Sequence, residues 1–442
     1  MRRTSTRRRY LTALGAAVTV PLAGCSAVLP TGPADSNNTS TNSSTSTKPS
    51  SPGAGTDTNT ETSQSGGPFS RGTVVENFEK KVGSRWQVST GKYTVDKKHP
   101  YQGSQSLVLR GQNNGAQKQE NGVSIYRSFY DSGGLDLRKH DLSIAVRFEQ
   151  PVRGRLAVEF IAPAESSMLT SRHFLPKELN GWTRIDLGYT GKTGNPVMKR
   201  VQELRISVRT DGEPITIGID DIRKLPKPPK GKVMFQFDDS HISTYTKAFP
   251  KLKEHDWTGG VAVIPDAIDT PENMTRNQMR EMGSAGWDMM SHPPVAKPLP
   301  QLPPNEQYRM IRESKRDLTV WGFNDGARHI VAPYGRISTK TIEIMQKYHN
   351  ANYIFGGSPG NAAHPSNMYA IPRVFGTSPD AVRDLLDLAT EFNQLVVIAY
   401  HEIGGNTETS VPMKDFESVL THVKETNMEV VSPSQFLESI DS

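Results

Sequence analysis

Short runs of alternating apolar and polar residues recur between Gly, Asn and Asp turns in residues 69–225. Period-two alternation is the pattern of a half-buried β-strand, and regular turn signals between such runs favour an all-β sandwich. The sequence therefore predicts a β-sandwich domain over 69–225. The runs that carry this prediction are Tyr93–Val95, Ser106–Leu109, Leu142–Val146, Leu156–Phe160, Thr183–Leu187 and Ile215–Ile219.

The pattern changes after the stiff, Pro-rich hinge Leu225–Lys230, where apolar runs begin to alternate with segments of helical periodicity. This alternation predicts a (β/α)7-type barrel over residues 231–442, with its active site where the strands end. The strands are expected at Lys232–Phe237, Gly260–Ile264, Trp287–Met290, His329–Ala332, Tyr353–Phe355, Leu395–Tyr400 and Met428–Val431. The main helices are expected at Asn305–Val320, Ser338–Tyr348, Ser378–Phe392 and Met413–Glu425.

Residues 1–25 have the features of an export signal. Thr6–Leu11 resembles a twin-arginine motif, and the apolar run Leu11–Leu22 is too short to span a bilayer, which takes about 20 residues. Leu22–Cys25 resembles a lipobox, so that Cys25 would become the lipidated first residue of the mature protein. The alternative is that Cys25 is an incidental small residue near a cleavage site. The lipobox interpretation predicts a lipoprotein on the extracellular face of the cell membrane.

Residues 26–68 are dominated by Ser, Thr, Asn, Gly and Pro. Such a segment buries too little apolar surface to offset its ordering entropy, so we expect a disordered linker between the membrane and the sandwich.

The formal charge of +6 arises almost entirely from the export signal. That segment holds five arginines and no acid, and without it 47 basic residues face 46 acidic ones. This balance gives no indication of a nucleic-acid partner.

Polar side chains capable of acid–base and metal chemistry follow three predicted strands of the barrel. Asp238 and Asp239 leave an apolar strand directly, and two adjacent carboxylates there are costly unless a cation or partner charge compensates them. His292 and His401 follow two further strands. An Asp and a His can hold one divalent ion with positions open for water, while the second Asp and the second His serve as base and acid.

These motifs resemble those of the polysaccharide deacetylases of the NodB-homology class, carbohydrate esterase family 4. Phe235–Asp239 resembles the family's T-F-D-D motif, Ser291–Pro293 the start of its H-x-x-x-H motif, and Pro333–Gly335 the end of R-x-P-Y-G. The resemblance implies a catalytic base at Asp238, metal ligands at Asp239 and His292, and a proton donor at His401. It also implies a divalent metal, Zn²⁺ by preference, and an oxyanion-binding backbone N–H near Tyr334.

Two positions depart from the family pattern. Ala296 stands where the second ligand histidine is expected, and His241 and His364 are the nearest candidates to replace it. Val331 stands where the third motif begins with arginine. The segment that ends at Arg373 resembles deacetylases of poly-N-acetylglucosamine exopolysaccharides, which implies that Arg373 pairs with Asp238 and keeps it ionised.

The order of landmarks in the sandwich resembles the galactose-binding-like jelly rolls that act as carbohydrate-binding modules. The resemblance implies a structural calcium held by Glu79 and Asp221, since carboxylates suit that ion. The alternative is that both are ordinary edge-strand acids. Trp86 and Trp182 could stack on sugars, but their positions favour the core.

The sequence thus supports two functions. One is a metal-dependent hydrolase that removes acetyl groups from an extracellular polysaccharide, anchored to the membrane by lipid. The other is a catalytically degenerate lipoprotein that binds glycans without turnover, which the residue at Ala296 favours. A glycoside hydrolase is disfavoured, because it needs two separated carboxylates across the sugar rather than one adjacent pair.

The lipobox interpretation predicts that Cys25→Ser abolishes lipid attachment. The variant should appear in the medium or stay unprocessed, because a single serine offers no thiol for the lipid. Fractionation and mass determination of the mature chain measure this outcome. Unchanged membrane retention with normal processing would contradict the interpretation.

Overall fold

The computed structural model describes residues 69–111, 121–150, 154–175, 178–210, 212–405 and 407–441. The predicted export signal with Cys25, and the predicted linker 26–68, lie outside the described residues. In the described part, no helix is both long and apolar enough to cross a membrane.

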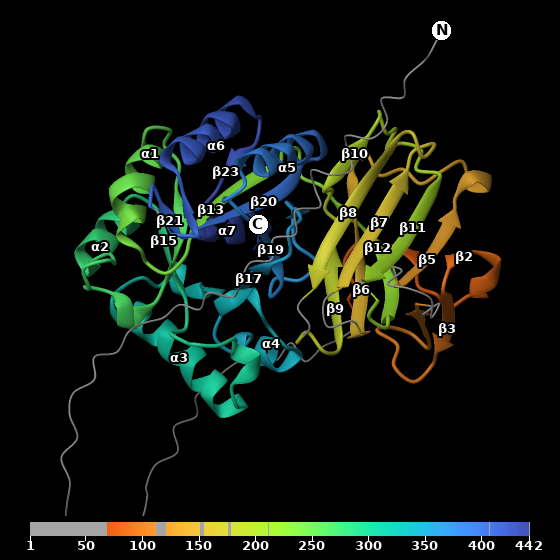
Figure 1. The fold of residues 1–442 in the computed structure, drawn as a ribbon, viewed down its shortest axis with the longest axis horizontal. Helices are drawn as coiled ribbons and strands as arrows, with labels where there is room; N and C mark the ends of the chain where they lie inside the picture. The colour runs from red at the N-terminus through yellow and green to blue at the C-terminus, as the bar shows by residue number, and fades with distance from the viewer. Residues whose placement is uncertain are drawn as a thin grey trace, which may run out of the picture. The chain divides into compact units, whose positions relative to one another are not determined.

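The N-terminal domain consists of two antiparallel sheets of six strands each (Figure 1). One sheet has the order β3-β4-β12-β6-β9, with β1 paired to β12, and the other has the order β10-β8-β7-β11-β5-β2. The strands of the first sheet are β1 Thr73–Glu76, β3 Lys92–Asp96, β4 Ser106–Arg110, β6 His140–Gln150, β9 Trp182–Asp186 and β12 Thr216–Pro226. Those of the second are β2 Gln87–Thr90, β5 Asn121–Ser128, β7 Gly154–Ile161, β8 Met168–Leu175, β10 Gly191–Thr193 and β11 Glu203–Thr210.

The apolar residues of the alternating runs pack between these two sheets. On β11, Leu204, Ile206 and Val208 are buried while their neighbours are partly or fully exposed, and they join one apolar cluster with residues of the other sheet. Trp86 is part of this core and donates its indole N–H to Glu76, whereas Trp182 is only partly buried. The all-β prediction is confirmed, and the finer prediction of a jelly roll stays a prediction.

The C-terminal domain is a closed barrel of seven parallel strands. The ring runs β13-β14-β15-β16-β17-β19-β20, and β20 pairs with β13 to close it. β18 Gly360–Asn361 adds antiparallel to β20, and β23 Glu429–Val430 pairs with the first two residues of β13. The ring strands are β13 Lys232–Phe237, β14 Gly259–Val263, β15 Asp288–Ser291, β16 His329–Val331, β17 Ala351–Phe355, β19 Ile371–Phe375 and β20 Gln394–Tyr400.

One member of the predicted ring is different in the structure. The segment 428–431 was expected as a barrel strand, but β23 lies beside β13 outside the ring, and β19 takes the seventh place. Pro372 is the second residue of β19 and makes this strand hard to recognise in the sequence, because proline lacks the N–H that a central strand donates. The (β/α)7-type architecture itself is confirmed.

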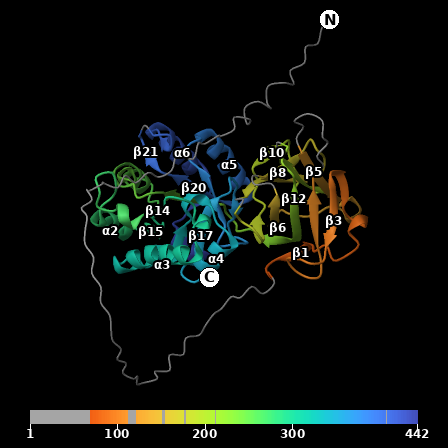
Figure 2. The ribbon, with the colours of Figure 1, turned by 60° about the horizontal axis from the view of Figure 1, so that its bottom comes forward.

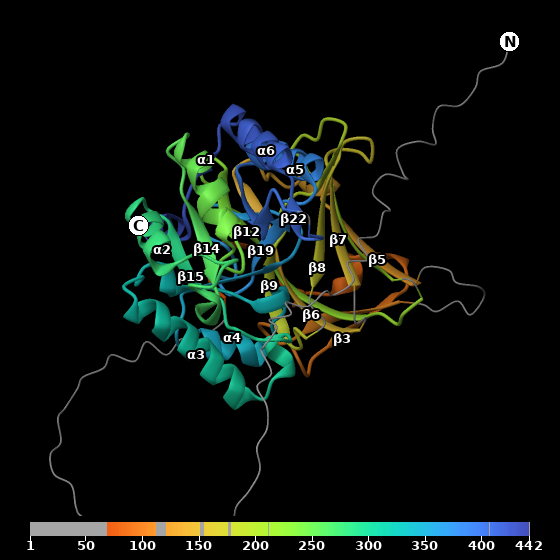
Figure 3. The same ribbon diagram turned by 60° about the vertical axis from the view of Figure 1, so that its left-hand side comes forward.

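Helices lie around the outside of the strands (Figures 2 and 3). α2 begins with a capping box, in which Thr275 and Gln278 satisfy each other's backbone N–H groups. α5 ends at Asn393, whose φ of 54° is the left-handed conformation that stops a helix. The helices are α1 Phe249–Lys253, α2 Arg276–Ser284, α3 Pro304–Val320, α4 Thr339–Met345, α5 Pro379–Phe392, α6 Met413–Glu425 and α7 Pro433–Asp441. A short parallel pair, β21 Glu402–Ile403 and β22 Ser410–Val411, follows β20.

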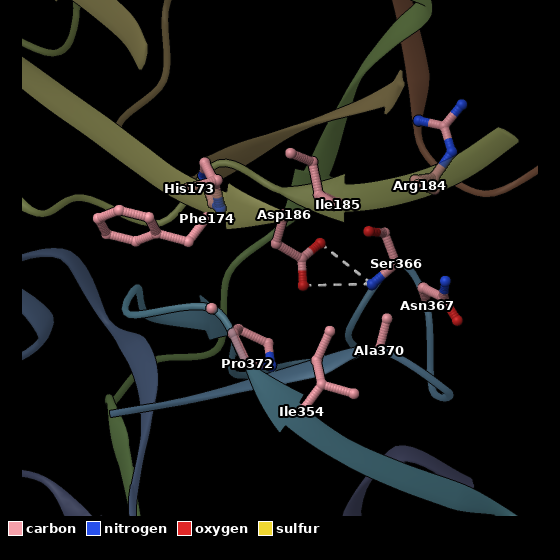
Figure 4. A pocket seen from close by; sticks show the side chains of 11 residues that line it. His173, Phe174, Arg184, Ile185, Asp186, Ile354, Ser366, Asn367, Ala370 and Pro372 are labelled. Atoms are coloured by element: carbon pink, nitrogen blue, oxygen red, sulfur yellow. Dashed lines mark hydrogen bonds between the residues drawn. The ribbon is translucent and has the colours of Figure 1, made fainter. Parts of the chain in front are cut away.

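Buried acids of the sandwich find their hydrogen-bond donors on the barrel. Asp186 accepts from the backbone N–H groups of Asn361 and Ser366, and Figure 4 shows the contact with Ser366. Asp141 accepts from the side chains of Asn361 and Gln394, and Lys227 of the predicted hinge forms an ion pair with it. Since an unpaired buried carboxylate costs several kcal/mol, on the order of 3–5, the two domains satisfy each other's polar groups.

A buried histidine at the same contact makes stability depend on pH. His173 lies between the hydroxyl groups of Ser171 and Ser358, at 2.6 and 3.1 Å, and burial lowers its pKa to about 4. In the unfolded chain its pKa is near 6.5, so the unfolded state binds more protons between these two values. This contribution to stability is complete above pH 6.5 and is lost as the pH falls toward 4, by about 1.4 kcal/mol per pH unit.

We predict that His173→Gln makes the unfolding free energy less dependent on pH between 6.5 and 4.5, because one proton-binding group is gone. Urea unfolding at several pH values measures the slope. An unaltered slope in His173→Gln would contradict the prediction.

Candidate active site

Four ring strands bring polar side chains to the same end of the barrel. β13 runs into Asp238 and Asp239, β15 into His292, and β20 into His401, while Arg373 lies near the end of β19. The Asp238 N–H donates to the carbonyl of Tyr400 at 2.8 Å, which continues the β13–β20 ladder to the strand ends. The carboxyl ends of parallel strands meet at one mouth of a barrel, and this mouth is where the fold places active sites.

Asp238 forms a bidentate ion pair with Arg373. The two guanidinium–carboxylate distances are 2.8 and 3.0 Å, and the side chains are only 3% and 1% exposed. Burial alone would raise the pKa of Asp238, but Arg373, with smaller contributions from His401 and His292, lowers it below its ordinary value. Asp238 is therefore an ionised, buried carboxylate at neutral pH.

Asp239 and His292 face each other. His292 Nε2 lies 3.4 Å from a carboxylate oxygen of Asp239, and His292 Nδ1 lies 2.9 Å from the carbonyl oxygen of Val331. Because a carbonyl only accepts, Nδ1 donates to Val331, and Nε2 faces the Asp239 carboxylate. Burial opposes a charge on His292, but the Asp239 and Asp238 carboxylates raise its pKa above the ordinary value. Asp239 has a φ of 66°, and such left-handed strain at a non-glycine residue is typical of functional sites.

His401 completes the group at the edge of the mouth. Its Nε2 lies 3.8 Å from Asp238 and 4.0 Å from Asp239, and its side chain is 23% exposed. The ring stacks on Phe375, with 6.1 Å between the ring centroids. His401 can therefore exchange protons with solvent while it faces both carboxylates.

Comparison with known proteins finds a family to which part of this barrel is similar. Residues 226–352 match the family model of polysaccharide deacetylases. This part of the chain is similar to that family. The match contains Asp238, Asp239 and His292, whereas Arg373 and His401 follow it in the chain.

Two curated proteins are similar to this chain. The chain is 30% identical over 150 residues to the putative polysaccharide deacetylase YxkH of Bacillus subtilis, a match that covers 34% of this chain and 52% of that protein. It is 24% identical over 180 residues to poly-beta-1,6-N-acetyl-D-glucosamine N-deacetylase from Staphylococcus aureus, covering 37% and 60%. The chain thus spans little more than half the length of these relatives.

A solved structure of the Streptococcus pyogenes deacetylase PplD in complex with acetate is 25% identical. It covers 34% of this chain and 69% of that one, with a TM-score of 0.31.

Asp239 and His292 present donor atoms for a divalent metal at the barrel mouth. In the described ranges, no group of three or more His, Cys, Asp or Glu side chains could hold an ion. The structure does not bring His241 to the pair, since the ring of His241 is turned to Ser243, 2.8 Å away. Ala296, where the resemblance seen in the sequence predicted a further histidine, is exposed in the loop after β15. Within the described part of the mouth, Asp239 and His292 are therefore the two donors that face each other.

Tyr334 lies in the turn Pro333–Gly335 that follows β16. Its φ of 60° and ψ of 11° are left-handed, and its hydroxyl donates to the carbonyl of Val295 at 3.4 Å. Gly335 also has a positive φ, 62°, and a Cβ there would lie 2.1 Å from the Phe355 ring, so only glycine fits. The oxyanion role predicted for a backbone N–H near Tyr334 stays a prediction.

The predicted calcium pair in the sandwich does not fit the structure. Asp221 is buried and forms ion pairs with Arg184 and Arg223, so two guanidinium cations occupy the oxygens that calcium would need. Glu79 accepts instead from the backbone N–H groups of Ser104 and Gln105 at 2.7 and 3.2 Å. Asp221 is therefore charge-compensated without a metal.

Two contacts in the site were not predicted from the sequence. The carbonyl of Val331 fixes the His292 ring, and no residue type encodes a backbone contact between neighbouring strands. Phe375 stacks on His401, and its place on a strand was hidden by Pro372. Recognising Ile371–Phe375 as a strand would have placed Phe375 next to the apolar strand that ends before His401.

We predict that Arg373→Gln destabilises the fold by about 3–5 kcal/mol, because it leaves Asp238 charged, buried and unpaired. The pKa of Asp238 should rise in the variant. Thermal and denaturant unfolding measure the change. Adding Asp238→Asn to Arg373→Gln should restore part of the lost stability, since the unpaired charge is then gone; a double variant less stable than Arg373→Gln alone would contradict this explanation.

Proposed function

We propose that the barrel hydrolyses acetyl groups from an extracellular polysaccharide. The observation that carries the proposal is the buried Asp238–Arg373 pair, directly beside Asp239, His292 and His401 at one barrel mouth. It supplies an ionised base, a protonatable histidine and two metal donors within contact of each other. The family match over 226–352 supports the same reaction.

In the proposed reaction, Asp238 accepts a proton from the attacking water. The water oxygen forms a bond to the acetyl carbonyl carbon, and a backbone N–H near Tyr334 stabilises the negative charge that develops on the carbonyl oxygen. His401 then donates a proton to the sugar nitrogen as the carbon–nitrogen bond breaks. The products are acetate and a free amine, and the proton held by Asp238 returns to solvent. An O-acetyl group would leave as an alcohol in the same way.

Asp239 and His292 would hold a divalent metal, Zn²⁺ by preference, together with solvent molecules. Such an ion supplies Lewis-acid polarisation of the carbonyl and lowers the pKa of bound water. The donor set fits because His292 Nε2 faces a carboxylate oxygen of Asp239 at 3.4 Å, while the Val331 carbonyl holds Nδ1.

The proposed substrate is an acetylated hexosamine polymer outside the cell. One relative is named for the N-deacetylation of poly-beta-1,6-N-acetyl-D-glucosamine, and that polymer is the first substrate to test. The lipid anchor proposed at Cys25 would hold the enzyme at the extracellular face of the membrane, where such polymers lie.

A second candidate is a glycan-binding lipoprotein without turnover. It is favoured by the two-donor metal site and by Ala296 in the place of a ligand histidine. The two candidates differ in whether the purified protein binds metal and releases acetate.

Substitution of each carboxylate tests the proposed reaction. Asp239→Asn should reduce the bound metal, because it removes one of two protein donors. Asp238→Asn should leave metal in place and abolish acetate release, since the base is gone. The bound metal and the released acetate are measured on the same preparation of each variant. Equal metal content and equal activity in both variants would show that the assignment is wrong.

A histidine introduced at position 296 tests the second candidate function, glycan binding without turnover. If the ion has only two protein ligands, Ala296→His should raise Zn²⁺ affinity and acetate release, because catalytic zinc usually has three. The exposure of Ala296 gives the new side chain room. Ala296→Gln is the matched control, with similar size and weaker metal affinity. A protein that stays free of metal in excess Zn²⁺ in all forms would favour the binding function.

A further inference from the structure

Aromatic side chains line one side of the barrel mouth. Phe355 ends β17, Phe375 ends β19 and His401 follows β20, so the three rings come from neighbouring strands at the same end of the barrel. The ring centroids of Phe355 and Phe375 are 4.1 Å apart, and those of Phe375 and His401 are 6.1 Å apart. Phe375 is 40% exposed. A continuous aromatic surface therefore leads away from the proposed proton donor.

Phe174 of the sandwich lies beside the loop that follows Phe355. The backbone N–H of Phe174, on β8, donates to the carbonyl of Gly356 at 3.4 Å, and Gly356 directly follows Phe355. A Cβ on Gly357 would lie 3.6 Å from the Phe174 ring, so this ring lies against the loop that leaves β17. Figure 4 shows the ring of Phe174 pointing away from the polar contact between Asp186 and Ser366.

Packing within the protein does not explain why the Phe174 ring is exposed. Phe174 is 51% exposed although it lies next to a buried interface, and Arg155 lies over its ring at 5.1 Å. Gly356 and Gly357 bring no side chains to the stretch between Phe355 and Phe174. Exposed apolar surface that continues into an active site is typical of a ligand-binding groove.

We propose that Phe174, Phe355 and Phe375, here termed the aromatic rim, bind sugar rings of the polysaccharide next to the residue that is deacetylated. The axial C–H groups of a β-linked pyranose form an apolar face that stacks on an aromatic ring, whose face carries partial negative charge. The sandwich thereby holds the same glycan chain on which the barrel acts. The substrate class rests on the proposed function, whereas the location of the binding surface rests on the rim.

The test compares short and long substrates. We expect disaccharides to reach only the catalytic group and the adjoining Phe375, and hexasaccharides of β-1,6-linked N-acetylglucosamine to extend to Phe174 as well. Phe174→Ala should raise KM for the hexasaccharide by about two- to tenfold, the worth of one aromatic stacking contact, and leave kcat and the disaccharide KM unchanged. Phe174→Trp should retain the low KM. Tyr130→Ala is the matched control, because Tyr130 is a sandwich aromatic that is 75% exposed and lies outside the rim.

Binding of the hexasaccharide to Asp238→Asn, with and without Phe174→Ala, gives a readout that does not need turnover. Weaker binding in the double variant supports the rim. Equal hexasaccharide KM and equal binding with and without Phe174, in an enzyme that releases acetate, would overturn the rim and leave the proposed function standing. A protein that neither binds the hexasaccharide nor releases acetate from it would overturn both for this substrate class.

Discussion

A negative charge that must stay buried is the constraint on which the barrel mouth depends. Asp238 follows a fully buried strand and is held in its charged form by Arg373, the third residue of β19. The pairing works only when β19, β20 and β13 are neighbours in a closed ring, because both guanidinium–carboxylate bonds cross β20. The ion pair therefore requires the closed ring of strands. The same ring places His401, which follows β20, next to Asp238.

The mouth combines a rigid side and an open side. Asp238, Arg373 and His292 are buried and fixed by hydrogen bonds to side chains or to the Val331 carbonyl. His401 and Phe375 are partly exposed and face the region a substrate would enter. Fixed polar groups need no reorganisation during a reaction, which is the property that electrostatic catalysis requires. The exposed aromatic rings leave a surface that a flexible sugar chain can follow.

Local pattern predicted most of the elements, and contacts between distant residues decided the rest. β13 and β20 were predicted almost residue by residue because they are uninterrupted apolar runs. β19 was missed because Pro372 is a poor strand residue, and the pairing of Arg373 came only from a family resemblance. The calcium prediction for Asp221 was wrong for a related reason: its partners Arg184 and Arg223 come from β9 and from β12 itself, and sequence order does not reveal which charges meet across a sheet.

The buried acids between the sandwich and the barrel limit how the two parts of the chain can be recombined in evolution. A domain that is joined by a free linker and shares little buried surface with its neighbour can be exchanged between chains without leaving polar groups unpaired. Here Asp186 and Asp141 need donors from Asn361, Ser366 and Gln394, and the connecting segment itself contributes Lys227 to Asp141. A gene fusion that paired this sandwich with an unrelated barrel would strand two carboxylates away from water. Selection should therefore keep both halves together as one evolutionary unit.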